Sequence, residues 1–207
     1  MKIEALGVID INNDTPMSED VFFVDSNVWF WLTYDRASLG DSKPKVYQLQ
    51  SYPEYIDAAY ITGSKMYRSG LSLSELSHLI EKVEKEIYSR THDVEIDLKQ
   101  FRRLDAERQN VIEQIELSWE QIKQMGRPLE NEIINETTTD NALLRIKTQL
   151  LDGYDLYMIE FVQQVGIKNI ISDDSDLASV PGIYLFTANQ RIIEQASKQG
   201  KLVTRGN

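Results

Sequence analysis

Short apolar runs rich in β-branched residues alternate along this chain of 207 residues with longer amphipathic segments. Apolar runs of this length, bounded by polar turn residues, are typical of strands that are buried on both faces of a sheet. The pattern predicts strands at 2–10, 21–24, 65–69, 167–171 and 183–186. Helices are expected at 53–62, 71–88, 97–125, 142–151, 155–165 and 189–198, with another starting at 28–32. Strands that alternate with helices predict an α/β fold, an α/β/α sandwich with a central, mainly parallel sheet.

The strongest helical signal is the segment 71–125, which contains no glycine or proline. Near its start, Ser72 and Glu75 have the spacing of a capping box, in which two side chains satisfy backbone amides at the beginning of a helix. Leu71 and Leu76 have the spacing of a hydrophobic staple. We therefore expect a capped helix that begins close to Glu75.

A second long helix is expected after a break at 89–93, with Asp97 and Gln100 as its N-terminal cap. If it ran unbroken over 97–125, it would be about 43 Å long at 1.5 Å per residue. Gly126 and Pro128 end it. The helices of about 77–127 are thus expected to form an extended helical insertion that projects beyond the core or packs on a partner.

Length and composition favour one folded domain over 1–207, in which 1–20 forms an N-terminal extension before the first confident strand. The chain contains no cysteine, which excludes a disulfide scaffold, a thiolate nucleophile and a zinc finger. No leader-like segment follows Met1, and no apolar run approaches the length of a membrane span. A cytoplasmic protein without a membrane partner is the expectation.

The net charge of −11 is unevenly distributed, and most of the acidity lies in 1–42 and 128–207. A nucleic-acid partner would be repelled at long range unless cations and a local basic patch offset this field. The charge argues against strong nonspecific binding to nucleic acid.

Four acidic residues occur at the starts or ends of the predicted elements: Asp25, Glu75, Asp155 and Asp174. Asp25 and Asp174 follow apolar strands, whereas the other two lie where helices begin. The carboxyl ends of parallel strands and the adjoining helix starts converge on one edge of a sheet, where ligands bind. Carboxylates gathered there would repel one another unless a cation held them, and oxygen ligands suit Mg²⁺ or Mn²⁺.

Each acid also has a simpler structural explanation when it is considered alone. Asp25 and Asp155 could cap the helices that follow them, and Glu75 is explained by the capping box. The acidic loop 172–176 could be a solvated turn. The order and context of the four acids, more than any one of them, favour a shared site.

That order resembles the PIN-domain family from Phe22 to the final helix. The motif VDSNVW and the segment YDLYMIEFVQQVGIKNIISDDSDL, in which an Asp opens a helix and a strand leads to an acidic loop, carry the resemblance. It implies a metal-dependent endoribonuclease that hydrolyses RNA phosphodiester bonds with Mg²⁺ or Mn²⁺. The implied catalytic residues are Asp25, Glu75, Asp155 and Asp174, the implied metal ligands are Asp25, Asp155, Asp174 and Asp176, and Asn27 and Ser172 would orient carboxylates or substrate.

The chain departs from the small members of this family in its N-terminal extension and in the long interval between Glu75 and Asp155. These departures leave open a catalytically weak interaction or scaffold protein, and a DNA-acting nuclease. Within the enzyme class, a toxin restrained by an antitoxin and a housekeeping RNA-processing nuclease both remain possible. The long helices could bind an antitoxin or another protein, and a homo-oligomer is a further possibility.

Other catalytic schemes find little support. There is no glycine-rich phosphate loop, and the two histidines, His78 and His92, suggest no Ser-His-Asp arrangement. Lys99, Arg102 and Arg103 could contact phosphates, although such charges on long helices usually form solvated faces.

Overall fold

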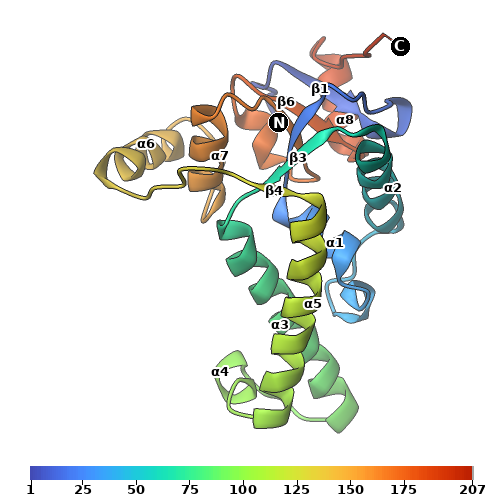
Figure 1. Ribbon diagram of the computed structural model, residues 1–207, viewed down its shortest axis with the longest axis vertical. Coiled ribbons are helices and arrows are strands. Elements are labelled where there is room, and N and C mark those ends of the chain that lie inside the picture. Colours follow the sequence, from blue (N-terminus) through green and yellow to red (C-terminus); the bar gives the residue numbers. More distant parts are fainter. Residues whose placement is uncertain (207) are drawn as a thin grey trace.

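A single six-stranded sheet lies at the centre of the computed structural model, which describes residues 1–206 (Figure 1). All strand pairs are parallel, and the strand order is β1-β6-β5-β2-β3-β4. The strands are β1 (Gly7–Asp10), β2 (Val21–Val24), β3 (Lys65–Arg68), β4 (Arg127–Pro128), β5 (Asn169–Ile171) and β6 (Tyr184–Thr187). The predicted α/β/α sandwich with a parallel sheet is confirmed.

Helices cover both faces of this sheet, and a pair of long helices extends away from it (Figure 1). The α-helices are α1 (Ser26–Thr33), α2 (Val46–Thr62), α3 (Leu71–His92), α4 (Leu98–Phe101), α5 (Asp105–Met125), α6 (Glu136–Ile146), α7 (Asp155–Gln164) and α8 (Gln190–Lys198). Short 3-10 helices occur at η1 (Ile11–Asn13), η2 (Ala37–Leu39) and η3 (Asp176–Ser179).

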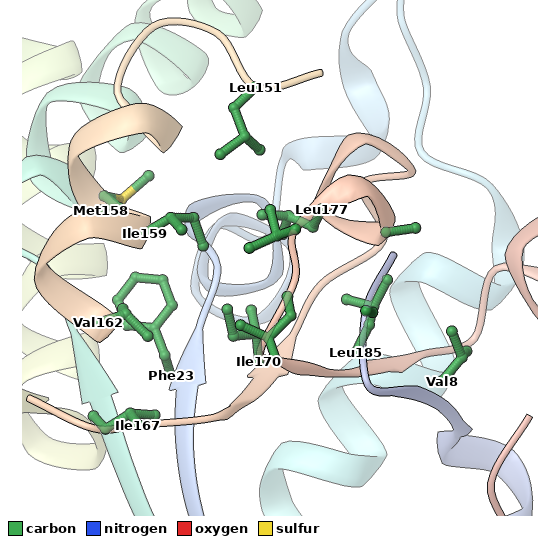
Figure 2. Packing of buried hydrophobic residues seen from close by; sticks show 14 of the residues in the cluster. Val8, Phe23, Leu151, Met158, Ile159, Val162, Ile167, Ile170, Leu177 and Leu185 are labelled. Carbon is green, nitrogen blue, oxygen red and sulfur yellow. The ribbon is translucent and has the colours of Figure 1, made fainter. Parts of the chain in front are cut away.

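The central strands bury apolar side chains on both faces, as their sequence predicts. Phe23 and Ile170 point into the core that α7, α8 and η3 cover, which Figure 2 shows from close by. The next residues in the alternation, Phe22 and Ile171, point into the opposite core beneath α1, α2 and α3. Because successive side chains of a strand point to opposite faces, a strand covered on both sides needs an uninterrupted apolar run.

The N-terminal segment belongs to the sheet. β1 pairs with β6 in parallel and forms one edge, and Val8 also makes an isolated parallel bridge with Leu202. The strand expected over 2–10 is shorter than predicted, since only Gly7–Asp10 is extended and paired. Across the described chain, no helix combines the length and the apolar character needed to cross a membrane.

The helices α3 and α5 form a hairpin that projects from the sheet, with α4 at its far end (Figure 1). The predicted cap at Asp97 is confirmed: its Oδ1 accepts from the Gln100 amide at 2.9 Å, and Gln100 Oε1 accepts from the Asp97 amide at 3.2 Å. However, the helix stops after one turn at Phe101. This ring is buried beside Tyr88 of α3, with ring centroids 5.6 Å apart, so the chain turns back. The unbroken 43 Å helix is therefore wrong, and α5 alone spans about 32 Å.

The capping box predicted at the start of α3 does not form. The helix begins earlier, with Gly70 as its N-cap residue, and Ser72 is fully buried with its Oγ 3.9 Å from Met158 Sδ. The first amides are satisfied from elsewhere: Glu132 Oε2 accepts from the Gly70 amide at 2.7 Å. Glu75 is consequently free for another role.

The hydrophobic staple is also wrong. Leu71 packs against the core beneath α7, whereas Leu76 is buried in the opposite core with α1 and α2. The two side chains lie in different hydrophobic cores because α3 passes from the core on one face of the sheet to the core on the other. Sequence spacing alone could not show this crossing.

Two further helices begin earlier than predicted. α2 begins at Val46, so Pro53 lies inside the helix, where it removes one backbone hydrogen bond. Burial of Tyr52 and Ile56 on the same helix favours the longer element. The helix expected over 142–151 runs over Glu136–Ile146 instead, because Asn135 caps it by accepting from the Thr138 amide at 3.0 Å.

Candidate functional site

The site lies at the carboxyl edge of the sheet, where β2 and β5 run side by side. Val24 and Ile171, the last residues of these strands, are paired in register. Asp25 follows directly, and its backbone amide donates to the Ile171 carbonyl at 3.1 Å. Asp25 occupies the N-cap position of α1, but its side chain makes no capping hydrogen bond and is 5% exposed. The carboxylate is therefore buried for a reason other than helix capping.

Helices from both sides of the sheet add two more carboxylates. Glu75 lies in the second turn of α3, and Asp155 is the first residue of α7. One carboxylate oxygen from each of Asp25, Glu75 and Asp155 lies within 4.8 Å of the other two. We call these residues the acidic triad. Three of the four acids singled out from the sequence thus meet at one point.

Asp174 and Asp176 do not belong to this tight group. Asp174 lies in the loop after β5, close enough for its charge to raise the pKa of Asp25, Glu75 and Asp155. Its Oδ1 accepts from the Asp176 amide at 2.8 Å, which shapes the loop. The Asp176 side chain lines a separate pocket of about 360 Å³. The geometry favours Glu75 over Asp174 and Asp176 as the third ligand.

Ser172, which follows β5, links the end of this strand to Asp25 of the triad by a hydrogen bond. Its Oγ donates to Asp25 Oδ2 at 2.7 Å and accepts from the Asp174 amide at 2.9 Å. The side chain is fully buried. Since a hydroxyl has one donor and can also accept, Ser172 fixes the rotamer of Asp25 and the path of the acidic loop together. This contact is of the orienting kind expected from the sequence.

Burial and crowding both favour protonation of the triad. Burial, followed by the charges of Asp25, Glu75 and Asp174, raises the pKa of Asp155 to about 9. Burial also raises the pKa of Asp25 to about 7, against the opposing effect of the Ser172 hydrogen bond and with the added effect of Glu75 and Asp174. The pKa of Glu75 is raised first by burial. The protein thus holds carboxylates together at an electrostatic cost.

Two contributors to the site were not identified from the sequence. The carbonyl of Asp152 accepts from the Asp155 amide at 3.1 Å, and the Asp152 charge raises the pKa of Glu75, Asp155 and Asp174. Its spacing of three residues before Asp155, across a glycine, was the available signal. Ser26 is 1% exposed, and its Oγ lies near enough to the Glu75 carboxylate to lower the pKa of Glu75, although the contact falls outside ordinary hydrogen-bond geometry.

Asp173 and Asn27 are close in sequence to residues of the site, but they have different roles in the structure. The Asp173 carboxylate points away from the triad and accepts from Tyr52 Oη at 2.7 Å and from Gln48 Nε2 at 2.6 Å. This contact anchors the acidic loop to α2. Asn27, in the first turn of α1, lines a pocket of about 460 Å³ together with Glu75. Asn27 is therefore placed beside the triad but at its open side.

The donor set fits a divalent cation. All three ligands are carboxylates, the kind of oxygen donor that Mg²⁺ and Mn²⁺ prefer. A cation would offset the burial and the repulsion that raise the three pKa values. Asp25, Glu75 and Asp155 are the residues that would hold it.

Comparison with known proteins gave no match: no family model, curated protein or solved structure is similar to this chain at the level searched. The resemblance to PIN domains therefore depends on the sequence motifs.

Proposed function

We propose that this chain is a metal-dependent nuclease that hydrolyses phosphodiester bonds in RNA, with Mg²⁺ or Mn²⁺ held by the acidic triad. The observation that carries the proposal is the convergence of Asp25, Glu75 and Asp155 within 4.8 Å at the carboxyl edge of a parallel sheet. Three carboxylates in mutual repulsion are costly to a fold, and binding of a cation would offset that cost.

In this proposal the side chains have distinct tasks. Asp25, Glu75 and Asp155 bind the cation, and Ser172 holds Asp25 in the binding rotamer. The bound cation would neutralise the charge that develops on the phosphoryl oxygens and make the attacking water more acidic. Asp174 lies next to the triad, half-buried, where it would accept a hydrogen bond from that water. Asn27, at the open side, would contact the substrate.

Two further features support hydrolysis of a nucleic acid. The order of the acids along the chain and the segment from Tyr154 to Leu177 resemble PIN-domain nucleases. A pocket of about 460 Å³ lies beside Glu75, and the exposed residues Ser74 and Tyr154 are among those that line it, which gives a substrate a way towards the triad. No histidine or cysteine is needed for this chemistry.

The experiment is cleavage of a labelled single-stranded RNA in Mg²⁺ or Mn²⁺, compared with the same reaction in EDTA. Asp25→Asn and Asp155→Asn each keep the side-chain shape and remove one ligand charge, so both should lose nearly all activity. Asp140→Asn is the matched control, because Asp140 is exposed on α6 and does not belong to the triad. A single-stranded DNA of the same sequence tests whether the sugar matters.

Full activity of Asp25→Asn would refute the proposal. Cleavage of DNA in preference to RNA would assign the site to a DNA-acting nuclease. Metal binding without cleavage of either polymer would favour a scaffold protein built on a nuclease fold.

A further inference from the structure

The pocket beside the triad continues along α3 towards the helical hairpin. A second pocket of about 410 Å³ adjoins the first, and the two share Ser74, His78 and Tyr154 as lining residues. We call the combined depression the α3 groove. The residues that line it include Asn27, Glu75, His78, Tyr154, Arg102 and Arg108. The groove connects the candidate site with the junction of α4 and α5, which Figure 1 shows beside α3.

The far end of the α3 groove carries excess positive charge. Glu81 is the acidic residue there, and its side chain is 5% exposed. Arg102 makes two hydrogen bonds to it, one from Nε at 2.6 Å, and Arg108 Nη1 lies 3.5 Å from the same carboxylate. One carboxylate neutralises only one guanidinium. About half of each arginine side chain remains exposed, so one positive charge with free donors faces the groove.

This local charge contrasts with the net charge of −11 on the chain. Arginine donors in a fixed geometry are suited to the oxygens of a phosphate. Since Arg102 is already committed to Glu81 by two hydrogen bonds, Arg108 is the residue with donors to spare.

The middle of the groove offers an aromatic surface. Tyr154 directly precedes Asp155 of the triad and is 44% exposed. An exposed ring in a groove is a platform on which a nucleotide base can stack, and such stacking tolerates any base. In a duplex the bases already stack on one another, so a platform of this kind favours an unpaired strand.

The two ends of the groove are separated by a distance that suits a short stretch of nucleic acid. Glu75 and Glu81 are six residues apart on α3, about 9 Å along the helix axis at 1.5 Å per residue. A stacked strand carries one phosphate per roughly 3.4 Å of its axis, so this length corresponds to about three phosphates.

We propose that the α3 groove binds a single-stranded nucleic acid, with a backbone phosphate held by Arg108 and a base stacked on Tyr154. This inference rests on the proposed function, and it adds a binding surface and a direction: the strand continues from the triad towards the helical hairpin. Arg108 and Tyr154 bind and position the strand, and take no part in the chemical step.

The test measures binding separately from cleavage. Fluorescence anisotropy would follow a labelled single-stranded RNA of about ten nucleotides, made with nuclease-resistant phosphorothioate linkages, in Mn²⁺ over a series of salt concentrations. Arg108→Gln is the main variant, because Arg102 keeps Glu81 paired when Arg108 is replaced. Arg103→Gln is the matched control, since Arg103 is exposed, adjacent to Arg102, and outside the groove.

Arg108→Gln should weaken binding about tenfold and reduce the slope of log K against log salt by about 0.7, the value for one lost phosphate contact with a single strand. Arg103→Gln should change the affinity and the salt slope less than Arg108→Gln does. Arg108→Lys should have the salt slope of the wild type. Tyr154→Leu should weaken binding about tenfold with an unchanged salt slope, whereas Tyr60→Leu, at another exposed tyrosine, should not.

Equal effects of Arg108→Gln and Arg103→Gln would overturn the phosphate subsite, even if the wild-type protein cleaves RNA. Binding that depends on Arg108 in a protein without any cleavage would keep the subsite and refute the proposed enzyme. Equal affinity for a duplex and a single strand, or no binding of either by the wild type, would overturn the inference.

Discussion

Replacement of Asp155 by asparagine should stabilise the protein when no metal is present. The change keeps the size of the side chain and removes one of the three charges of the acidic triad. Asp155 is the residue whose pKa is raised most within the triad, first by burial and then by the charges of its neighbours. An unfavourable charge is therefore removed, which is the opposite of what a substitution at an ordinary buried position does.

The size of the effect follows from the separation of the carboxylates. The ligand oxygens lie within 4.8 Å of one another, and at that limit two unit charges repel by about 3 kcal/mol at an effective dielectric constant of about 20. Asp155→Asn removes two of the three pairwise repulsions, while partial protonation of the wild-type triad already relieves some of them. We expect a net gain of about 3 kcal/mol at pH 8, which corresponds to an increase in Tm of about 6–12 °C for a chain of this length.

The gain should depend on pH with a defined sign. The folded-state pKa values of Asp25 and Asp155 lie near 7 and 9, above the ordinary value of 3.8, so the folded protein binds more protons than the unfolded chain. The stability of the metal-free wild type therefore falls as the pH rises from about 4 through 7 towards 9. Near pH 4 the folded triad is protonated and uncharged, so the repulsion that the substitution removes is absent and the difference between variant and wild type should be small.

The assay is thermal and urea unfolding in EDTA at pH 4, 6 and 8, with the exposed Asp140→Asn as the control for loss of a single charge. Addition of Mn²⁺ should stabilise the wild type, by about 2.7 kcal/mol at a hundred times the Kd, and have little effect on Asp155→Asn. The reasoning is refuted if Asp155→Asn is no more stable than the control at pH 8 in EDTA.

Three further substitutions test the residues that support the site. Ser172→Ala removes the hydroxyl that links Asp25 to the acidic loop, and should weaken Mn²⁺ binding about tenfold by isothermal titration calorimetry; unchanged affinity would show that Ser172 does not orient Asp25. Tyr52→Phe removes a buried hydroxyl that donates to Asp173, and should cost about 2 kcal/mol in urea unfolding, whereas a loss below about 0.5 kcal/mol would contradict the role of this anchor. Arg145→Met leaves the carboxylate of Glu160, 6% exposed, without its ion pair, and should cost about 3 kcal/mol; a second substitution, Glu160→Met, should recover most of that loss.

The parts of the fold that were predicted from sequence are those set by local pattern. The strands at β2 and β5 were found because a strand covered on both faces must be apolar throughout, as Phe22 and Phe23 illustrate. Asp25 and Asp174 were placed at the sheet edge for the same reason, since each follows such a strand. The cap at Asp97 was also predicted, because its partner is only three residues away.

The errors occur where a distant contact decides the outcome. Glu75 has the spacing of a cap, but Glu132 satisfies the start of α3 and Glu75 faces Asp155, which is remote in sequence. The break after Phe101 depends on its burial beside Tyr88 of the preceding helix. All three members of the triad were among the four acids named from the sequence, but single-sequence patterns carry no information on such pairs, so the structure was needed to separate them from Asp174.

The proposed function requires that the acidic triad binds a divalent cation. A crystal structure of the wild-type protein soaked in Mn²⁺, with an anomalous difference map, tests it directly. The account predicts a peak within coordination distance of Asp25, Glu75 and Asp155, with Ser172 still bonded to Asp25. An ordered triad without a peak, or a Mn²⁺ ion bound only at other residues, would contradict it.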